Sequence, residues 1–378
     1  MGFENLLEDS IAQLCAAGKG ILAADESPGT LGKRLKNTPE LSHLENVEEI
    51  RRQWREILVT SDTGPYFCGV IMHEETLLQS TEQGKLFVDC LREKKILAGI
   101  KVDQGLAPLG GTSADETSTK GLDTLEERCA KYRNQGARFA KWRAALKVTA
   151  NLPSPECVWE NAEQLARYAK ICQDQGLVPI VEPEILINTD YDMARSKIVS
   201  THVLSEVVSC LKDHRVDLSK CLLKPQMVMP GTECPEPKAT PSEVASATLE
   251  VFDACLPHDL AGVFFLSGGL TEEQATENLN EINRLACQRY PSPSDPFDCV
   301  PWKLSFSFGR ALQASVLKLW AGRKENGDKC RDQSRALAEA NFRACGGAYQ
   351  GPHPSLLKDR ESLVETFRGM SSMPDTAK

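Results

Sequence analysis

Recognisable metal-ligand patterns are missing from the sequence. Its six histidines include no H-x-H or H-x-x-x-H pair, and none of its 14 cysteines forms a C-x-x-C motif. Zinc sites usually draw ligands from such closely spaced groups, so we expect no metal site. Cysteines scattered singly are typical of reduced thiols in a cytoplasmic protein. We therefore expect thiols even at Cys287 and Cys299, which flank a long loop, and a disulfide between them is the less favoured alternative.

The sequence also has no long hydrophobic segment and no block of basic residues. A membrane-spanning helix needs roughly 18 or more consecutive apolar residues, and no segment approaches that length. The start, MGFENLLEDS, lacks the basic stretch and apolar core of a secretory signal. With 44 Lys and Arg against 53 Asp and Glu, the net charge is −9, and no run of cations could follow a phosphate backbone. We expect a cytoplasmic protein with neither a membrane nor a nucleic acid as its partner.

What the sequence does contain is an alternation of short apolar runs and amphipathic stretches. Its 378 residues are 41% hydrophobic, which is ordinary for one large globular domain or two smaller ones. Eight apolar runs start at intervals of 29 to 48 residues, and each ends in polar residues or glycine, as buried strands of a parallel sheet do. The runs occupy residues 20–27, 68–75, 97–103, 139–146, 177–186, 221–228, 261–269 and 302–309.

Helical patterns lie between these runs. Apolar residues recur every three or four positions in segments 45–60, 160–176 and 271–286, and Gly136 and Gly176 are placed as C-terminal stops. Eight strand–helix units predict an α/β fold, the (β/α)8 TIM barrel. An open doubly wound sheet is the alternative, but no G-x-G-x-x-G motif follows the first run. We therefore favour the barrel.

No segment has the composition of an interdomain linker. The proline-rich segments 232–243 and 290–301 each lie between a predicted strand and a predicted helix, so we interpret them as long loops of one domain. The periodicity fades after Gly346. We predict one barrel domain over residues 1–345 and a C-terminal tail over 346–378 that lies on the surface or moves freely.

Ionisable residues gather where the predicted strands end, which is where barrel enzymes place their active sites. The period of two in a strand puts Lys101 with Asp103, Lys141 with Arg143, and Glu182 with Glu184 on common faces. If those faces point into the barrel, the charges converge at its mouth. The alternative is that the pairs face the helices or only neutralise one another. Further charged residues stand at the ends of the first and sixth runs, namely Asp25 and Lys224.

The residue types at this mouth suit carbonyl chemistry on an anionic substrate. We expect cationic neighbours to depress the pKa of a lysine there, and a neutral amine can attack a carbonyl to form a Schiff base. Ser267, Gly268 and Gly269 precede a helix that opens at Thr271, so their backbone N–H groups could hold a phosphate beside Arg310. A Ser-Gly-Gly turn alone is weak evidence, because glycine turns after strands are common.

Seven segments together are far more specific. They are GKGILAADES, GIKVDQG, GARFAKWRAALK, GLVPIVEPEIL, LLKPQMVMPG, FLSGG and SFSFGRALQ. In order and spacing, from about Gly18 to Gly322, they closely resemble the matching segments of class I fructose-1,6-bisphosphate aldolases. The resemblance implies reversible aldol cleavage of fructose 1,6-bisphosphate to dihydroxyacetone phosphate and glyceraldehyde 3-phosphate, in glycolysis and gluconeogenesis. It also implies a homotetramer.

The resemblance assigns a role to each matching residue. Lys224 in LLKP would form the Schiff base, Glu182 in VEPE would act as acid and base in carbinolamine dehydration, and Asp25 in AADES would handle the C4 hydroxyl proton. Lys141 would contact that hydroxyl and help to hold Lys224 neutral, and Glu184 is counted with the catalytic group. An iminium would serve as the electron sink, so no cofactor or metal is expected. The phosphate contacts would be Ser267, Gly268, Gly269, Gly309 and Arg310 nearest the carbonyl, and Ser27, Thr30, Arg34, Lys101 and Arg143 at the far end.

Two departures from the family pattern bear on function. The first strand is followed by Ser27-Pro28-Gly29-Thr30, where the family often has Ser-Thr-Gly-Ser. The family chain ends in a tyrosine thought to move the proton at C3, whereas this chain ends in PDTAK and its last tyrosine is Tyr349. Two alternatives stay open, an aldolase acting mainly on a monophosphate and a scaffold protein that keeps the fold but works by binding partners.

Overall fold

Eight parallel strands close into a barrel in the computed structural model, which describes residues 2–235, 237–291 and 301–356. Each predicted apolar run contains or overlaps one barrel strand, so the (β/α)8 prediction is confirmed. Around the barrel the strands follow the order β1-β10-β9-β8-β7-β6-β3-β2. Their bounds are β1 Gly20–Ala24, β2 Phe67–Met72, β3 Leu97–Lys101, β6 Phe139–Lys147, β7 Val178–Leu186, β8 Leu222–Leu223, β9 Gly262–Phe265 and β10 Lys303–Phe308.

A small antiparallel hairpin was not predicted. It pairs β4, Leu106–Pro108, with β5, Thr117–Thr119, outside the barrel. Both strands have only three residues. The residues of β4, Leu-Ala-Pro, are largely exposed, and those of β5, Thr-Ser-Thr, are polar, so neither is the longer buried apolar run on which the strand predictions depend.

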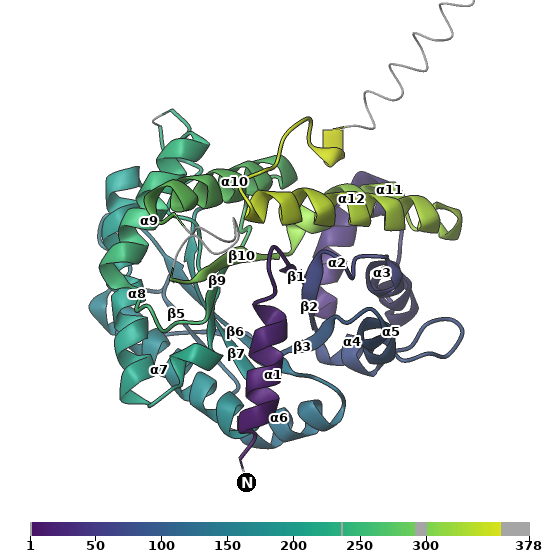
Figure 1. Cartoon of the computed structure of the whole chain (residues 1–378), viewed down its shortest axis with the longest axis horizontal. Helices are drawn as coiled ribbons and strands as arrows, with labels where there is room; N and C mark the ends of the chain where they lie inside the picture. The colour runs from purple at the N-terminus through teal and green to yellow at the C-terminus, as the bar shows by residue number, and fades with distance from the viewer. Residues whose placement is uncertain (1, 236, 292–300, 357–378) are drawn as a thin grey trace, which may run out of the picture.

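Helices surround the barrel and connect its strands (Figure 1). The predicted helical segment 45–60 contains α3, whereas α7 begins five residues before its predicted segment, at Pro155, and α10 continues three residues beyond its own, to Arg289. The earlier start has a local cause, because the Ser154 hydroxyl accepts the Cys157 N–H and Pro155 occupies the first turn. The helices are α1 Glu4–Leu14, α2 Pro28–Asn37, α3 Glu48–Thr60, α4 Glu74–Leu78, α5 Phe87–Glu93, α6 Leu125–Asn134, α7 Pro155–Asp174, α8 Met193–Asp213, α9 Pro241–Cys255, α10 Glu272–Arg289, α11 Ala314–Trp320 and α12 Gly327–Cys345.

Glycine ends two of these helices as predicted. Gly136 follows α6 with a φ of 107°, and Gly176 follows α7 with a φ of 76°. Both values lie in the left-handed region, where a residue without a Cβ atom is favoured.

The N-terminal end of the barrel is filled and covered by apolar side chains. Leu7 and Leu14 of α1 belong to the same buried cluster as Phe139 and Ile180, which come from barrel strands. Figure 1 shows α1 lying across the strands at this end. A larger cluster fills the space between the strands and the outer helices. The ionisable residues predicted at the strand ends lie at the other end of the barrel.

The start of the predicted tail packs against the domain. The Tyr349 N–H donates to the Asn280 side chain at 2.9 Å, and the buried His353 ring lies 3.1 Å from the Thr276 hydroxyl. Residues 346–356 therefore cover α10 and α12. Residues 357–378, on which the rest of the tail prediction falls, lie outside the described residues.

The cysteine prediction fails at one position. Twelve described cysteines are free thiols, but Cys287 is disulfide-bonded, so the expected thiol there is wrong. Sequence spacing alone could not show this, because a disulfide depends on how closely the tertiary fold brings two sulfur atoms together. Cys299 lies outside the described residues.

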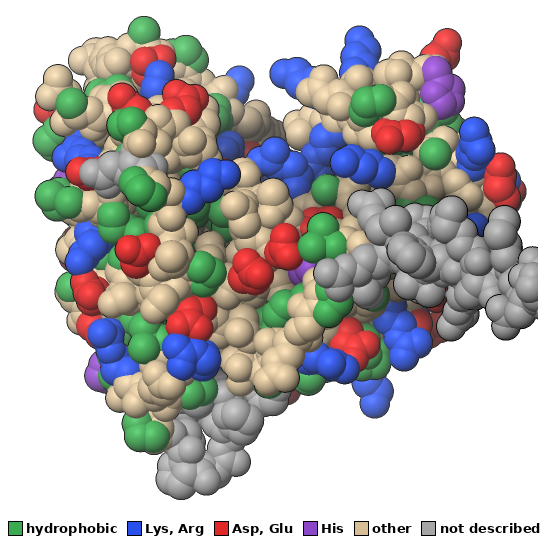
Figure 2. All heavy atoms as spheres, turned by 90° about the horizontal axis from the view of Figure 1, so that it is seen from above, with side chains coloured by type: hydrophobic (Ala, Val, Ile, Leu, Met, Phe, Trp, Pro, Cys, Tyr) green, Lys and Arg blue, Asp and Glu red, His purple; other side chains and the backbone are tan. Residues whose placement is uncertain are grey.

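Charges of both signs are mixed on the surface. Figure 2 shows acidic and basic side chains interspersed over one face, with hydrophobic side chains in small groups. Within the described ranges, no helix has the length and apolar character needed to cross a membrane.

Candidate active site

A cavity of about 680 Å³ opens where the barrel strands end. Fourteen of the fifteen predicted site residues line it, although they come from positions as far apart as Asp25 and Arg310. Gly269 is the exception. It has a φ of 87° and lies beside Ile187, outside the lining.

Strand register explains why the central charges meet. In the β3–β6 pair Lys101 stands beside Lys141, and in the β6–β7 pair Arg143 stands beside Glu182. Parallel neighbours in register point their side chains to the same face, which here is the barrel interior. The predicted common faces are therefore the inward ones.

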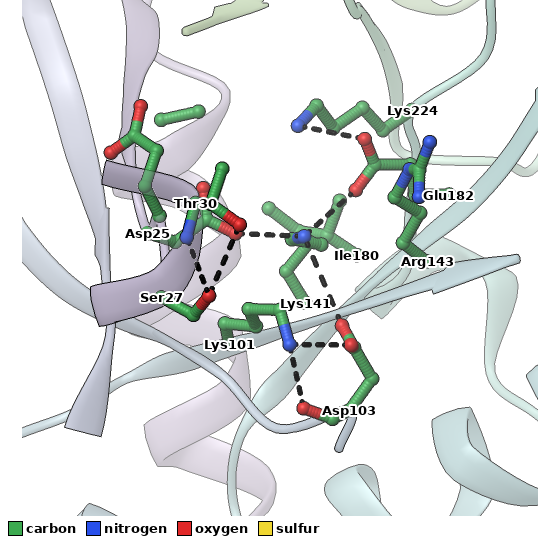
Figure 3. A network of polar contacts seen from close by, with 12 residues as sticks. Asp25, Ser27, Thr30, Lys101, Asp103, Lys141, Arg143, Ile180, Glu182 and Lys224 are labelled. Atoms are coloured by element: carbon green, nitrogen blue, oxygen red, sulfur yellow. Dashed lines mark hydrogen bonds and ion pairs between the residues drawn. The ribbon is translucent and has the colours of Figure 1, made fainter. Parts of the chain in front are cut away.

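Lys141 is the centre of a buried ion network (Figure 3). Its ammonium nitrogen lies 2.8 Å from an Asp25 oxygen, 3.2 Å from Glu182 Oε2 and 3.9 Å from an Asp103 oxygen. The other Glu182 oxygen, Oε1, lies 3.1 Å from the Lys224 nitrogen. Glu182 thus joins the two lysines, and all these side chains except Asp25 are at most 5% exposed.

The network shifts the pKa values of its members. Burial by itself raises the pKa of Asp25, but the charges of Lys141 and Lys224 outweigh it and hold that pKa well below its ordinary value. Burial by itself lowers the pKa of Lys141, but Asp25, Glu182 and Asp103 outweigh it and raise that pKa above its ordinary value. The pKa of Lys141 moves upward because carboxylates and not cations surround its nitrogen.

Two further ion pairs stand nearer the cavity mouth. Lys101 pairs with Asp103 and also donates to the Asp103 carbonyl at 2.7 Å. Arg143 pairs with Glu184. The alternative in which the charges neutralise one another therefore holds for these pairs, which form inside the cavity. Each pair also presents a cation to the cavity interior.

Ser27 connects the first strand to a helix that begins at the cavity. Its hydroxyl accepts the Thr30 N–H at 3.3 Å and lies 3.1 Å from the Thr30 hydroxyl, so it caps α2. Pro28 occupies the first turn of that helix, where its fixed φ suits the backbone. Although Pro28 departs from the family pattern, the Ser27 and Thr30 hydroxyls both remain at the cavity.

Side chains crowd Gly268 in the lining of the cavity. A Cβ atom at Gly268 would lie 2.7 Å from the Leu266 side chain and 3.0 Å from a Glu184 oxygen. Ser267 is 6% exposed and, with Gly268, Gly309 and Arg310, lines the same wall. These residues follow β9 and β10, which are hydrogen-bonded neighbours in the barrel.

A buried network behind the cavity was missed in the sequence. Glu26 pairs with Arg34 and also with Arg55, whose nitrogen is 2.6 Å from it. The Gln313 amide donates to the Ala23 carbonyl at 2.7 Å. Arg55 comes from the middle of α3, and Gln313 precedes α11, so no local pattern could connect them with β1. Asp103, by contrast, could be found from the sequence, because it stands at the end of a predicted strand.

Comparison with known families agrees with this geometry. The model of the class I fructose-bisphosphate aldolase family matches residues 6–368. The chain belongs to this family. Fructose-bisphosphate aldolase B of Bos taurus is 49% identical over 345 residues, covering 91% of this chain and 90% of that protein. The cytoplasmic isozyme of Spinacia oleracea is 48% identical over 339 residues, covering 89% and 90%.

A solved structure is also similar. The fructose-bisphosphate aldolase of Plasmodium falciparum, in complex with TRAP and a small-molecule inhibitor, aligns with a TM-score of 0.86 and 44% identity over 93% of this chain and 96% of that one. The enzyme is therefore a class I fructose-bisphosphate aldolase in fold and in reaction, cleaving fructose 1,6-bisphosphate reversibly into two triose phosphates.

Proposed function

We propose that Lys224 is the nucleophile that forms the Schiff base with the substrate. The observation that carries this proposal is the position of Glu182, whose two oxygens lie 3.1 Å from the Lys224 nitrogen and 3.2 Å from that of Lys141. Glu182 first accepts a proton from the Lys224 ammonium, and the neutral nitrogen then attacks the ketose carbonyl carbon, with one of its protons passing to the carbonyl oxygen to give a carbinolamine. Glu182 returns its proton to the departing hydroxyl, which leaves as water, and the iminium remains.

Asp25 takes the proton in the cleavage step. Burial would raise its pKa, but the charges of Lys141 and Lys224 outweigh burial and hold the pKa well below its ordinary value. Asp25 therefore stays a carboxylate at neutral pH. It accepts the proton of the C4 hydroxyl as the C3–C4 bond breaks, and the bonding electrons pass into the iminium to give an enamine. Lys141 contacts the same hydroxyl, and its charge stabilises the developing negative charge. Glu184 orients Arg143 through their ion pair.

The two phosphates are bound by two sets of residues that line the cavity. Ser267, Gly268, Gly309 and Arg310 bind the phosphate nearest the carbonyl, and Gly269 supports the turn behind them. Lys101, Arg143 and Arg34 with the Ser27 and Thr30 hydroxyls bind the far one. This second set of cations supports a bisphosphate substrate over a monophosphate, because a single phosphate would engage only one of the two sets.

Peptide mapping after borohydride reduction tests the nucleophile. Enzyme reduced with dihydroxyacetone phosphate should carry the adduct on the peptide that contains Lys224, and Lys224→Met should abolish trapping. Lys147→Met is the matched control, because Lys147 is on β6 but forms an exposed ion pair with Asp115. An adduct on Lys141 or Lys101 would contradict the assignment.

The resemblance also supports a cytoplasmic homotetramer. The spinach relative is a cytoplasmic isozyme, and on this chain the hydrophobic side chains of Trp159 and Ile198 are 54% and 62% exposed on the neighbouring helices α7 and α8. Light scattering should give four times the chain mass of 41.6 kDa. A mass of one or two chains at micromolar concentration would contradict the tetramer.

A further inference from the structure

A second large cavity lies at the opposite end of the barrel from the active site. Its volume is about 730 Å³, slightly more than the active-site cavity, and no described residue lines both. Its walls come from the end of α1, from α5, from the end of α6 and from the first residues of β3, Leu97 and Ala98. Figure 1 shows these helices around the covered end of the barrel. The cleavage reaction uses none of these residues.

The lining of this cavity is strongly cationic. It has five basic side chains and one acidic side chain, Asp89. Four positive charges are therefore left uncompensated in a chain whose net charge is −9. The five cations are Lys19, Arg92, Lys95, Arg133 and Arg138.

Most of these cations have no carboxylate partner among the described residues. Arg138 donates to the carbonyls of Ala137 and Arg133, at 2.8 and 3.3 Å, and Arg133 donates to the Gln175 carbonyl at 2.7 Å. Only Arg92 forms an ion pair, with Asp89 at 2.6 Å. Carbonyl bonds hold the guanidinium groups in place, but a carbonyl has no full charge to neutralise them.

The positive charges of this cavity repel one another at Arg138. Burial lowers the pKa of Arg138, and the charges of Arg133 and Arg92 lower it further. No nearby carboxylate offsets them, unlike at Arg143 in the active site, where Glu184 does. Like charges gathered in a half-buried recess cost free energy unless an anion is bound there.

We propose that this cavity is a binding site for a small soluble polyanion, a compound that carries two or more phosphate groups. Guanidinium groups match phosphate oxygens in shape and charge, and three arginines from α5, α6 and the start of β6 contribute to one recess. The volume resembles that of the cavity which takes a sugar bisphosphate, so a compact ligand fits. The site is separate from the catalytic one.

Titration calorimetry with sodium tripolyphosphate tests the proposal. The measurement uses Arg310→Ala protein, in which phosphate binding at the active site is weakened, and binding at the second cavity is the part of the signal that the cavity variants below reduce. Adding Arg138→Gln to this protein should weaken the affinity of the second cavity for tripolyphosphate about tenfold or more, since a charged hydrogen bond is lost. Arg92→Gln is the second variant, because this side chain is 79% exposed and its loss does not endanger the fold. Arg92→Gln should also weaken the binding of tripolyphosphate.

The matched control is Arg343→Gln, which removes an exposed arginine of α12 that lines neither cavity. It should leave tripolyphosphate binding unchanged, and Arg138→Gln in the otherwise native enzyme should leave cleavage of fructose 1,6-bisphosphate unchanged. Equal affinity in the Arg310→Ala protein with and without Arg138→Gln or Arg92→Gln would overturn the proposal. Binding seen only on phosphatidic acid vesicles, and lost in the same variants, would overturn the assignment to a soluble ligand.

Discussion

Replacing Lys141 by methionine should destabilise the enzyme strongly, because it removes the one cation that three carboxylates share. Asp25, Glu182 and Asp103 have oxygens within 2.8, 3.2 and 3.9 Å of its nitrogen. Methionine fills a similar volume, so the change isolates the charge. Breaking a buried ion pair by removing one partner costs about 3 to 5 kcal/mol. At the usual unfolding entropy per residue, a chain of this size should lose about 4 to 6 °C in Tm.

The pH dependence of this loss follows from the direction of the pKa shifts. Asp25 has a folded pKa below its ordinary value of 3.8, so its contribution is present above that pH and is lost as pH falls through the folded pKa. Lys141 has a folded pKa above its ordinary value of 10.5, so its contribution is present below that pH and is lost as pH rises through the folded pKa. The stability difference between native enzyme and Lys141→Met should therefore be largest between about pH 5 and pH 9. It should shrink below about pH 4.

Urea unfolding followed by circular dichroism, at pH 3, 7 and 9, measures the difference. Lys147→Met is again the control, because its ion pair with Asp115 is exposed on the same strand and is worth less than about 1 kcal/mol. If Lys141→Met unfolds at the same urea concentration as Lys147→Met at pH 7, the buried network does not hold the barrel mouth together. Lys141→Met should also lose cleavage activity, measured by coupled assay at pH 7.

Three further outcomes are expected. Arg310→Ala should raise the KM for fructose 1,6-bisphosphate about tenfold or more, since it removes a charged phosphate contact; an unchanged KM in steady-state assays would remove Arg310 from the site. Burial lowers the pKa of His353 to about 4, so the folded state should lose stability as pH falls from about 6.5 toward 4, and His353→Gln should flatten that loss in urea unfolding at pH 7 and 5. Removing residues 364–378 should reduce turnover by less than about tenfold, because no tyrosine follows Tyr349; a hundredfold loss with normal single-turnover cleavage would mean that another group of the tail moves the proton.

The amino-acid sequence by itself determined the repeating units of this protein. Apolar runs at a regular spacing predict strands because a buried parallel strand must be apolar on both faces. The pairs Lys141 with Arg143 and Glu182 with Glu184 were predicted to share faces because side chains alternate along a strand. Gly136 and Gly176 were predicted to end helices because that conformation needs a residue without a Cβ atom. All these features depend on neighbours within a few residues.

Only the tertiary structure decided which charges meet and what surrounds them. Asp25 and Lys141 are brought to 2.8 Å by barrel closure and strand register, and neither can be read from a local pattern. The carboxylates that raise the pKa of Lys141 come from three separate parts of the chain, namely Asp25, Asp103 and Glu182. Arg55 acquires its partner Glu26 in the same way, from a part of the fold that local periodicity does not connect with it. Electrostatic environments sum over all neighbours in space, so they are set by the assembled barrel.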